Sequence, residues 1–198
     1  MAAGLVLFSA NSYANTCNYE LQKDSTQVGW TAYKTTQKAP VEGSFPKAKI
    51  SGASSSRKGL SDLLSKMKAD VSFGEVAEIH TGNPTRDQTL LDHFFSLIKG
   101  KEVKGSLAKV KGSDTEGDFE LKLEMNGVTK EVPMHYIRDN AGKLEAKGEI
   151  DVLNFGLDTA LADLHKSCET LHKGADGVSR TWNTVALRLT STITKTCK

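Results

Sequence analysis

The chain has 198 residues, a formal charge of +2 and 25% charged side chains. This length fits one domain or at most two small ones, and the composition is that of a folded chain rather than a disordered one. The near-neutral charge and the even spread of basic residues exclude the basic stripe of a nucleic-acid-binding protein.

Residues 1–14 differ from the rest of the chain. An apolar run over residues 2–10 and a small-x-small cleavage site at residues 12–14 predict the remnant of a signal peptide that lacks its basic start. The run is too short to span a bilayer, so no stable membrane insertion is expected. The residues before Cys17 make a poor lipoprotein signal. We therefore expect cleavage after residue 14 and a single domain, residues 15–198, free in the periplasm.

Alternation of apolar and polar residues predicts strands in the next part of the chain. Val28, Trp30 and Ala32 fall on one face of the first of them. The predicted elements up to residue 81 are a strand over 27–33, a strand with a bend over 41–50, a Gly/Ser-rich loop over 51–57, a short helix over 60–67 and a long strand over 69–81.

The segment from Gly82 to Gly100 predicts one helix directly after a strand. Thr85 and Gln88 have the spacing of a capping box, Asp87 lies where the helix dipole favours an acid, and a glycine ends the helix. Its apolar face consists of Leu90, Leu91, Phe94 and Phe95. A single aromatic-faced helix among strands is either a plug or lid for a β-barrel or a helix that packs on the outside of a sheet.

The second half of the chain alternates again. Asn126-Gly127 is the strongest hairpin signal and is typical of a type I′ turn. A second helix is expected over residues 158–173, and we interpret residues 174–177 as its end. The strands predicted around these elements cover residues 102–111, 119–125, 128–136, 144–152 and 182–194.

About eight strands with short turns predict consecutive antiparallel pairing. The expected fold class is therefore all-β, an antiparallel β-barrel of about eight strands with two short helices. A barrel of this size is either filled by its own side chains or holds one elongated ligand.

The three cysteines permit one intramolecular disulfide in an oxidising compartment. Cys17 begins the first predicted strand and Cys197 ends the last, and these ends are neighbours in a closed antiparallel barrel with an even number of strands. We therefore predict a Cys17–Cys197 disulfide. Cys168 is the alternative partner of Cys17 if its loop folds back across the end of the barrel.

His165, Cys168 and His172 are spaced to lie on one side of the second helix, and imidazole and thiolate are good zinc or copper ligands. Cys168 also belongs to an apolar stripe, where a free cysteine packs as a small hydrophobe. We favour packing and predict no metal and no cofactor. The alternative is a stress- or redox-related binding protein with a thiol or metal site at these three residues.

The sequence contains no motif for phosphate binding, dinucleotide binding, a serine nucleophile or a zinc protease. His93 lies beside aromatic residues, and no hydroxyl or thiol nucleophile is spaced to pair with it. We therefore predict that the protein is not an enzyme. A lipid-modifying enzyme that uses His93 or His165 is the weakest alternative.

Four motifs in order along the chain resemble the YceI-like family. The first is Trp30 on the first predicted strand, and the resemblance covers roughly residues 18–194. The other three are residues 41–45 (Val-Glu-Gly-Ser-Phe), residues 83–90 (Asn-Pro-Thr-Arg-Asp-Gln-Thr-Leu) running into Phe94-Phe95, and residues 125–132 (Met-Asn-Gly-Val-Thr-Lys-Glu-Val).

The resemblance implies a periplasmic polyisoprenoid-binding protein with a lipocalin-like barrel. A long apolar lipid, an isoprenoid or a fatty acid or amide, would lie in the barrel interior and undergo no chemistry. Members of this family are often dimers, so a homodimer is a further expectation. Arg86 is expected at the mouth, either on a head group or in an ion pair with Asp87 or Asp92. The expected wall consists of Trp30, Phe45, Phe73, Leu90, Phe94, Phe95, Met125, Met134, Phe155 and Trp182.

Overall fold

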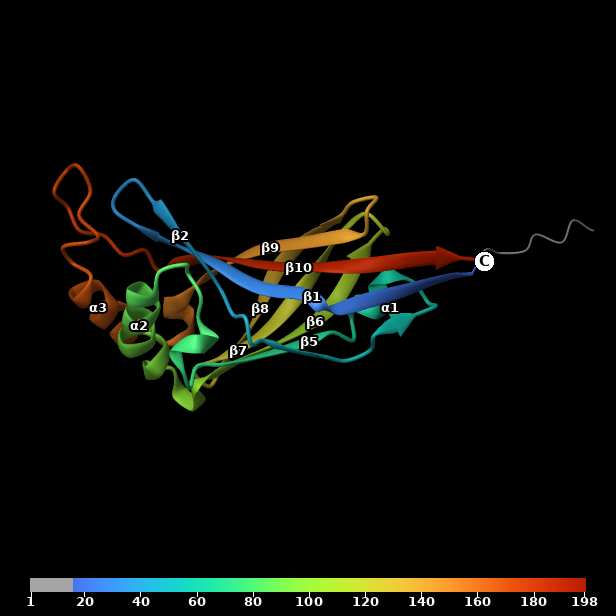
Figure 1. Cartoon of the computed structure of the whole chain (residues 1–198), viewed down its shortest axis with the longest axis horizontal. Helices are drawn as coiled ribbons and strands as arrows, with labels where there is room; N and C mark the ends of the chain where they lie inside the picture. Colours follow the sequence, from blue (N-terminus) through green and yellow to red (C-terminus); the bar gives the residue numbers. More distant parts are fainter. Residues whose placement is uncertain (1–15) are drawn as a thin grey trace, which may run out of the picture.

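The structure is a computed structural model and describes residues 16–198. The predicted signal-peptide remnant, residues 1–14, lies outside the described residues. Strands dominate the described part of the chain (Figure 1). They are β1 (Cys17–Lys34), β2 (Ala39–Ser44), β3 (Lys49–Ser51), β4 (Ser55–Ser56), β5 (Lys68–Ser72), β6 (Glu102–Gly112), β7 (Glu116–Met125), β8 (Val128–Arg138), β9 (Lys143–Asp151) and β10 (Thr184–Cys197).

Helices are few and short in residues 16–198, and none is long and apolar enough to cross a membrane. The α-helices are α1 (Leu60–Leu64), α2 (Pro84–His93) and α3 (Asp158–Ser167). The 3₁₀ turns are η1 (Val76–Glu78), η2 (Phe95–Leu97), η3 (Lys99–Lys101) and η4 (Val152–Phe155).

The strands form one antiparallel sheet in the order β2-β1-β10-β9-β8-β7-β6-β5-β3, and β4 pairs with β1 beside this path. From β5 to β10 each strand pairs with the next one in the chain, as the short turns predict. The left-handed φ angles of Asn126 (55°) and Gly127 (77°) make the predicted hairpin between β7 and β8. The predicted all-β, antiparallel, barrel-like class is confirmed.

One segment, residues 39–56, supplies both edges of the sheet. β2 pairs with β1, β3 pairs with β5, and β4 returns to β1. The sheet is therefore a curled half-barrel whose open side is crossed by this segment. The predicted strand over 41–50 is interrupted because Phe45 donates its backbone N–H to Val28 and accepts one from Ala48, which turns the chain between β2 and β3.

Alternating burial along the strands defines the interior. β8 shows it most clearly, because Val132, Met134 and Tyr136 are buried while the residues between them are exposed. Successive side chains of a strand point to opposite faces, so the apolar set of each strand faces the enclosed side.

The predicted start and end of the first long helix are wrong. α2 begins at Pro84, and the side-chain oxygen of Asn83 accepts a hydrogen bond of 3.1 Å from the backbone N–H of Arg86. Asparagine is a strong N-cap and proline is favoured at the first helical position, so the Thr85–Gln88 capping box does not form. The helix ends at His93 rather than near residue 100, because Phe94 adopts a non-helical conformation (φ −137°, ψ −63°).

Two further boundaries differ from the predictions. α3 ends at Ser167 rather than at residue 173, because residues 172–174 pair with residues 178–180 instead of continuing the helix. Residues 174–177 therefore form the turn of a loop and not a helix end. β5 ends at Ser72 rather than at residue 81, because the chain leaves the strand after Ser72 and then forms η1.

The two ends of the half-barrel are built differently (Figure 1). α2 and α3 lie together at one end, where His93 Nδ1 is 2.8 Å from Asp163 Oδ2. We call this the helical end. α1 lies at the other end and buries Leu60, Leu63 and Leu64 almost completely. This second end is therefore filled by the protein's own side chains.

Cys17 and Cys197 form the predicted disulfide, and Cys168 is free and buried, so the alternative pairing with Cys168 is wrong. The two bonded cysteines are direct partners in the β1–β10 register. We call this the disulfide end of the barrel.

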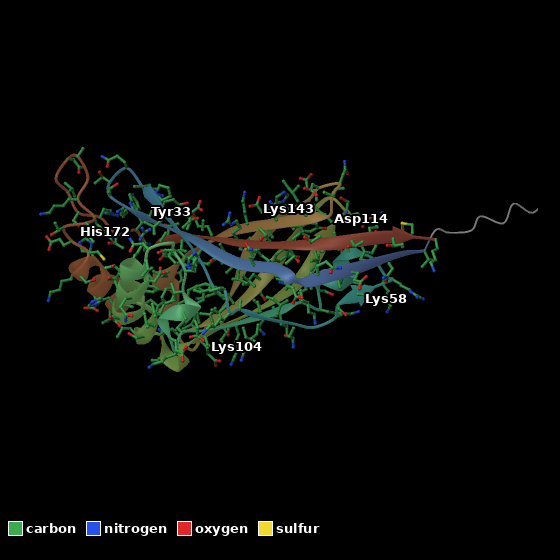
Figure 2. All side chains as sticks on the ribbon, viewed as in Figure 1. Tyr33, Lys58, Lys104, Asp114, Lys143 and His172 are labelled. Carbon is green, nitrogen blue, oxygen red and sulfur yellow. A yellow bond between two sulfur atoms is a disulfide. The ribbon has the colours of Figure 1, made fainter. Side chains whose placement is uncertain are left out.

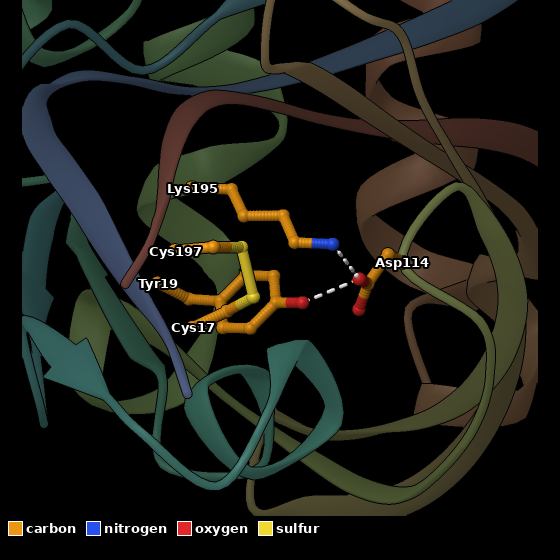
Figure 3. The surroundings of a disulfide bond; sticks show 5 residues. All are labelled: Cys17, Tyr19, Asp114, Lys195 and Cys197. Carbon is orange, nitrogen blue, oxygen red and sulfur yellow. Dashed lines mark hydrogen bonds and ion pairs between the residues drawn. A yellow bond between two sulfur atoms is a disulfide. The ribbon is translucent and has the colours of Figure 1, made fainter. Parts of the chain in front are cut away.

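A polar cluster lies beside the disulfide (Figure 3). Tyr19 of β1 donates its hydroxyl to the carboxylate of Asp114, and Lys195 of β10 lies 2.7 Å from the same oxygen. Burial and the hydrogen bond to Asp114 raise the pKa of Tyr19, so the phenol remains a donor at neutral pH. The cluster ties β1 and β10 to the turn between β6 and β7.

Removal of the disulfide is expected to destabilise the fold. The bond joins residues 180 positions apart and so restricts the unfolded chain, and native disulfides typically contribute about 2–4 kcal/mol. The double variant Cys17→Ser/Cys197→Ser should lose about this free energy of unfolding in urea denaturation. A reductant should lower the free energy of unfolding of the wild type and leave that of the variant unchanged. Equal stability of the two proteins under oxidising conditions would contradict the prediction.

Candidate functional site

A cavity of about 190 Å³ lies inside the half-barrel toward the helical end. Strands β1, β3 and β5 to β10, together with α2 and α3, contribute to its lining, which is almost entirely apolar. Buried residues of the disulfide end, such as Leu21, Leu144 and Ile193, are absent from this lining and pack with one another in the core. The cavity is thus a dead-end slot that starts under the helices and stops at the filled end.

An aromatic cluster connects the C-terminal end of α2 to the cavity wall. Phe95 stacks on Phe73 with ring centroids 4.6 Å apart, and its edge meets Phe45 at 5.8 Å and Phe94 at 5.4 Å. The ring centroid of Trp30 lies 6.4 Å from that of Phe95. Because these rings join α2 to three separate parts of the wall, the helix covers the end of the barrel. The structure favours the lid interpretation over a helix on the outside of the sheet.

Hydrogen bonds at the start of α2 hold this lid in place, in addition to the aromatic contacts at its end. Asp87 in the first turn of α2 is buried, and its carboxylate accepts hydrogen bonds from the backbone and the hydroxyl of Thr81. A carboxylate near a helix N-terminus is also favoured by the helix dipole. These bonds join the loop before α2 to the helix, and Leu90 and Phe94 line the cavity.

Trp30 occupies the wall because Gly43 gives it room. The two residues are cross-strand partners, and a Cβ at Gly43 would lie 2.1 Å from Cζ2 of the indole. Only glycine allows this approach. The indole N–H is buried without an acceptor, which leaves one unsatisfied donor within an apolar wall.

The structure brings most of the predicted site residues together. The exceptions are Arg86, which is half-buried, and Phe155, which is a buried residue of η4; neither lines the cavity. Arg86 forms neither of the predicted ion pairs, since Asp87 is bonded to Thr81 and Asp92 accepts from Gln88. The predicted residues that line the cavity are Trp30, Phe45, Phe73, Leu90, Phe94, Phe95, Met125, Met134 and Trp182.

The sequence-based choice of wall residues was biased toward large aromatic side chains. Smaller apolar residues line the cavity just as much, and their alternation along the strands was the available signal. Examples are Val28 and Ala32 in β1 and Leu121 in β7. Thr181 also lines the cavity, but it lies in an irregular loop that no periodic pattern marks.

A polar cluster lies at the helical end, where Figure 2 labels His172 and Tyr33. The hydroxyl of Thr181 is 2.7 Å from Nδ1 of His172 and 3.0 Å from Nδ1 of His165. A hydroxyl donates one hydrogen bond, so it donates to one ring and accepts from the other. When both rings are neutral, they therefore carry their protons on different nitrogens.

This arrangement does not support the metal or redox alternative. Both histidines direct Nδ1 at Thr181, and residues 16–198 contain no group of three His, Cys, Asp or Glu side chains that could hold a metal ion. The thiol of Cys168 is buried, and its sulfur lies 3.8 Å from the hydroxyl of Ser167. Cys168 is thus placed as the apolar-stripe interpretation expects.

The predicted catalytic candidates do not reach the cavity. His93 pairs with Asp163 between α2 and α3, and both side chains are about 40% exposed. His165 faces Thr181 as described above. Neither histidine belongs to the cavity lining, so a ligand held there does not meet them.

A curled antiparallel sheet around an apolar cavity is the architecture of barrels that hold one small ligand. The model of the YceI-like domain matches residues 19–189. The chain therefore belongs to the YceI-like family, in agreement with the four sequence motifs.

Solved structures support the same fold. A polyisoprenoid-binding domain from Saccharophagus degradans, implicated in plant cell wall breakdown, is 11% identical and covers 88% of this chain and 97% of its own, with a TM-score of 0.57. BcnA of Burkholderia cenocepacia is 14% identical over 88% and 99% of the chains, with a TM-score of 0.53. The YceI protein of Campylobacter jejuni is 18% identical over 82% and 89%, with a TM-score of 0.50. No curated protein matches the sequence.

Replacement of Gly43 is expected to displace Trp30. Gly43→Ala places a methyl group where the indole ring of Trp30 lies. Overpacking of this kind costs about 1–3 kcal/mol. The free energy of unfolding should fall by this amount and the tryptophan emission should shift. Gly74→Ala is the matched control, because its Cβ would meet no atom closer than 3.7 Å. Equal effects of the two substitutions would contradict the role of Gly43.

His172 is expected to remain neutral at pH 7. Burial, and then the positive charges of Lys34 and His165, lower its pKa from 6.5 to about 4. The unfolded chain therefore takes up this proton first as the pH falls. The stability that neutral His172 contributes is complete above pH 6.5 and is lost as the pH falls toward 4.

NMR titration of the histidine rings measures this pKa directly. The substitution His172→Gln should also flatten the loss of stability between pH 6.5 and 4. A His172 ring that titrates at or above pH 6.5 would show that the residue is not buried as described.

Proposed function

We propose that the protein binds one long apolar lipid chain in its interior and holds it without chemical change. The ligand class is an isoprenoid or a fatty acid or amide. The apolar cavity beneath α2 is the observation that carries this proposal. The fold of the family supports lipid binding in general, and the similar domain from Saccharophagus degradans is a polyisoprenoid-binding domain.

The energetics favour an apolar chain over water in this slot. An apolar cavity of about 150 Å³ stays dry and takes up small hydrocarbons, and this cavity is somewhat larger. Each methylene that leaves water for such a wall contributes about 0.8 kcal/mol. Met125 and Met134 add flexible thioethers, which adapt to the irregular outline of a branched chain.

The position of the lid and of the filled end supports one orientation of the bound chain. α1 fills the disulfide end with Leu60, Leu63 and Leu64, so the tail points toward this end and the head lies beneath α2 and α3. A role of Arg86 in head-group binding stays a prediction, since this residue lies outside the lining.

Location and assembly belong to the same proposal. The Cys17–Cys197 disulfide is typical of an oxidising compartment, and the leader-like start of the sequence favours export to the periplasm. A carrier or sequestering role there does not require catalysis. A homodimer stays a prediction from the family resemblance.

Filling the slot tests the proposal. Leu121→Trp should occupy cavity volume and lower the affinity for a fluorescent long-chain fatty-acid analogue about tenfold, because displacing two methylenes costs about 1.6 kcal/mol. Lys122→Trp, which adds the same side chain on the outer face of β7, is the matched control. Prenols should compete with the analogue. Binding that both variants retain equally would place the ligand outside the cavity.

A further inference from the structure

Two loops project together from the helical end, beyond α2 and α3 (Figure 1). They are residues 34–38 and residues 168–183, and we call them the mouth loops. Thr35 accepts the indole N–H of Trp182 at 2.7 Å and donates its backbone N–H to Arg180 at 3.0 Å. These bonds join segments far apart in the sequence into one projecting surface.

The mouth loops expose large apolar side chains that nothing in the described chain covers. Leu171 is 71% exposed and Val178 is 51% exposed, although the loop that carries them is fixed by backbone bonds between Gly174 and Val178 and between His172 and Arg180. Single exposed apolar residues are ordinary on a protein surface. Two of them on one ordered loop, which also carries the cavity-lining residues Thr181 and Trp182, favour an interaction site.

The same surface carries positive charge that is not neutralised by ion pairs. Lys34, Lys38, Lys173 and Arg180 form no ion pair with a carboxylate in residues 16–198, and Lys34 instead contacts the carbonyl of Leu171. These loops contain two acidic residues, Glu169 and Asp176. The carboxylate of Asp176 accepts a hydrogen bond from the hydroxyl of Thr36.

Trp182 lies at the centre of this surface. Nζ of Lys38 is 4.6 Å from its ring centroid, and the guanidinium of Arg180 is 4.5 Å from it. The indole is half-buried and lines the cavity together with Thr181. One aromatic residue therefore borders both the charged surface and the apolar interior.

We propose that the mouth loops dock the protein on an anionic lipid bilayer, with Leu171 and Val178 entering the interface. Basic side chains beside apolar ones, with a tryptophan between them, combine electrostatic attraction to anionic head groups with burial of apolar surface. An acidic protein surface would satisfy the charges, but it would need an apolar pocket of its own to bury Leu171.

This inference rests on the proposed function and extends it. Because Trp182 lines the cavity, docking by the mouth loops turns the cavity mouth toward the bilayer. A long apolar chain then passes from the membrane into the slot without crossing water. The bilayer is thus the source or the destination of the ligand.

Vesicle flotation with the folded, full-length mature protein tests the docking. The wild type should float with vesicles of phosphatidylglycerol and phosphatidylcholine, should float much less with phosphatidylcholine alone, and should detach as salt rises. Leu171→Asp and Lys173→Glu should each lower the partition coefficient at least about fivefold.

Matched controls lie at the opposite end of the molecule. Ile137→Asp replaces a side chain that is 57% exposed on β8. Lys143→Glu reverses a charge at the first residue of β9, and Figure 2 shows Lys143 far from His172. Both controls should float like the wild type. The proposal would be overturned if the controls lost as much binding as the mouth-loop variants. It would also be overturned if the wild type did not float at low salt.

Uptake of the fluorescent fatty-acid analogue in vesicle-free solution separates docking from ligand binding. Leu171→Asp and Lys173→Glu should retain this uptake, because neither residue lines the cavity. Uptake without flotation would refute docking and leave the proposed function standing, whereas flotation without uptake would refute the proposed function. The protein could also fail to float but bind immobilised polyglutamate, with Leu171→Asp binding as well as the wild type. This result would assign the surface to an acidic protein and would also refute docking.

Discussion

The pairing of β1 with β10 is the constraint on which the rest of the structure depends. It brings the first and last strands together along most of their length, from Cys17 opposite Cys197 to Thr31 opposite Ala186. One end of this pair becomes the disulfide with its Tyr19–Asp114–Lys195 cluster. The other end continues through the bridge between Lys34 and Thr181 into the mouth loops. A single ladder therefore sets both the closed end and the open end of the barrel.

The two ends then differ by what fills them. At the disulfide end, α1 and the inward residues of the neighbouring strands occupy the interior, and a disulfide and buried polar bonds prevent the strands from separating. At the helical end, a short helix held by Asn83 and Asp87 covers a slot with rings rather than filling it. An apolar space that closes at one end and is covered by a short lid at the other suits a flexible chain that enters tail first.

Sequence reasoning predicted the parts of the fold that follow from periodicity. Alternation located most strands, Asn126-Gly127 located a hairpin, and the positions of the cysteines in the first and last strands predicted the disulfide. Helix ends were predicted less well, because local caps and tertiary pairing decided them. Asn83-Pro84 capped α2 in place of Thr85, and residues after Ser167 paired with a distant segment. The mouth loops carry no periodic signal, so their joint surface appears only when the chain is folded.

Native mass spectrometry of the mature protein, purified from a bacterial periplasm without detergent, tests the central claim most directly. The account predicts a bound species that is lost on denaturation and that extracts into organic solvent as an apolar chain. A bare protein that also fails to take up added prenols or fatty amides would contradict it, because the interior would then be filled by the protein's own side chains.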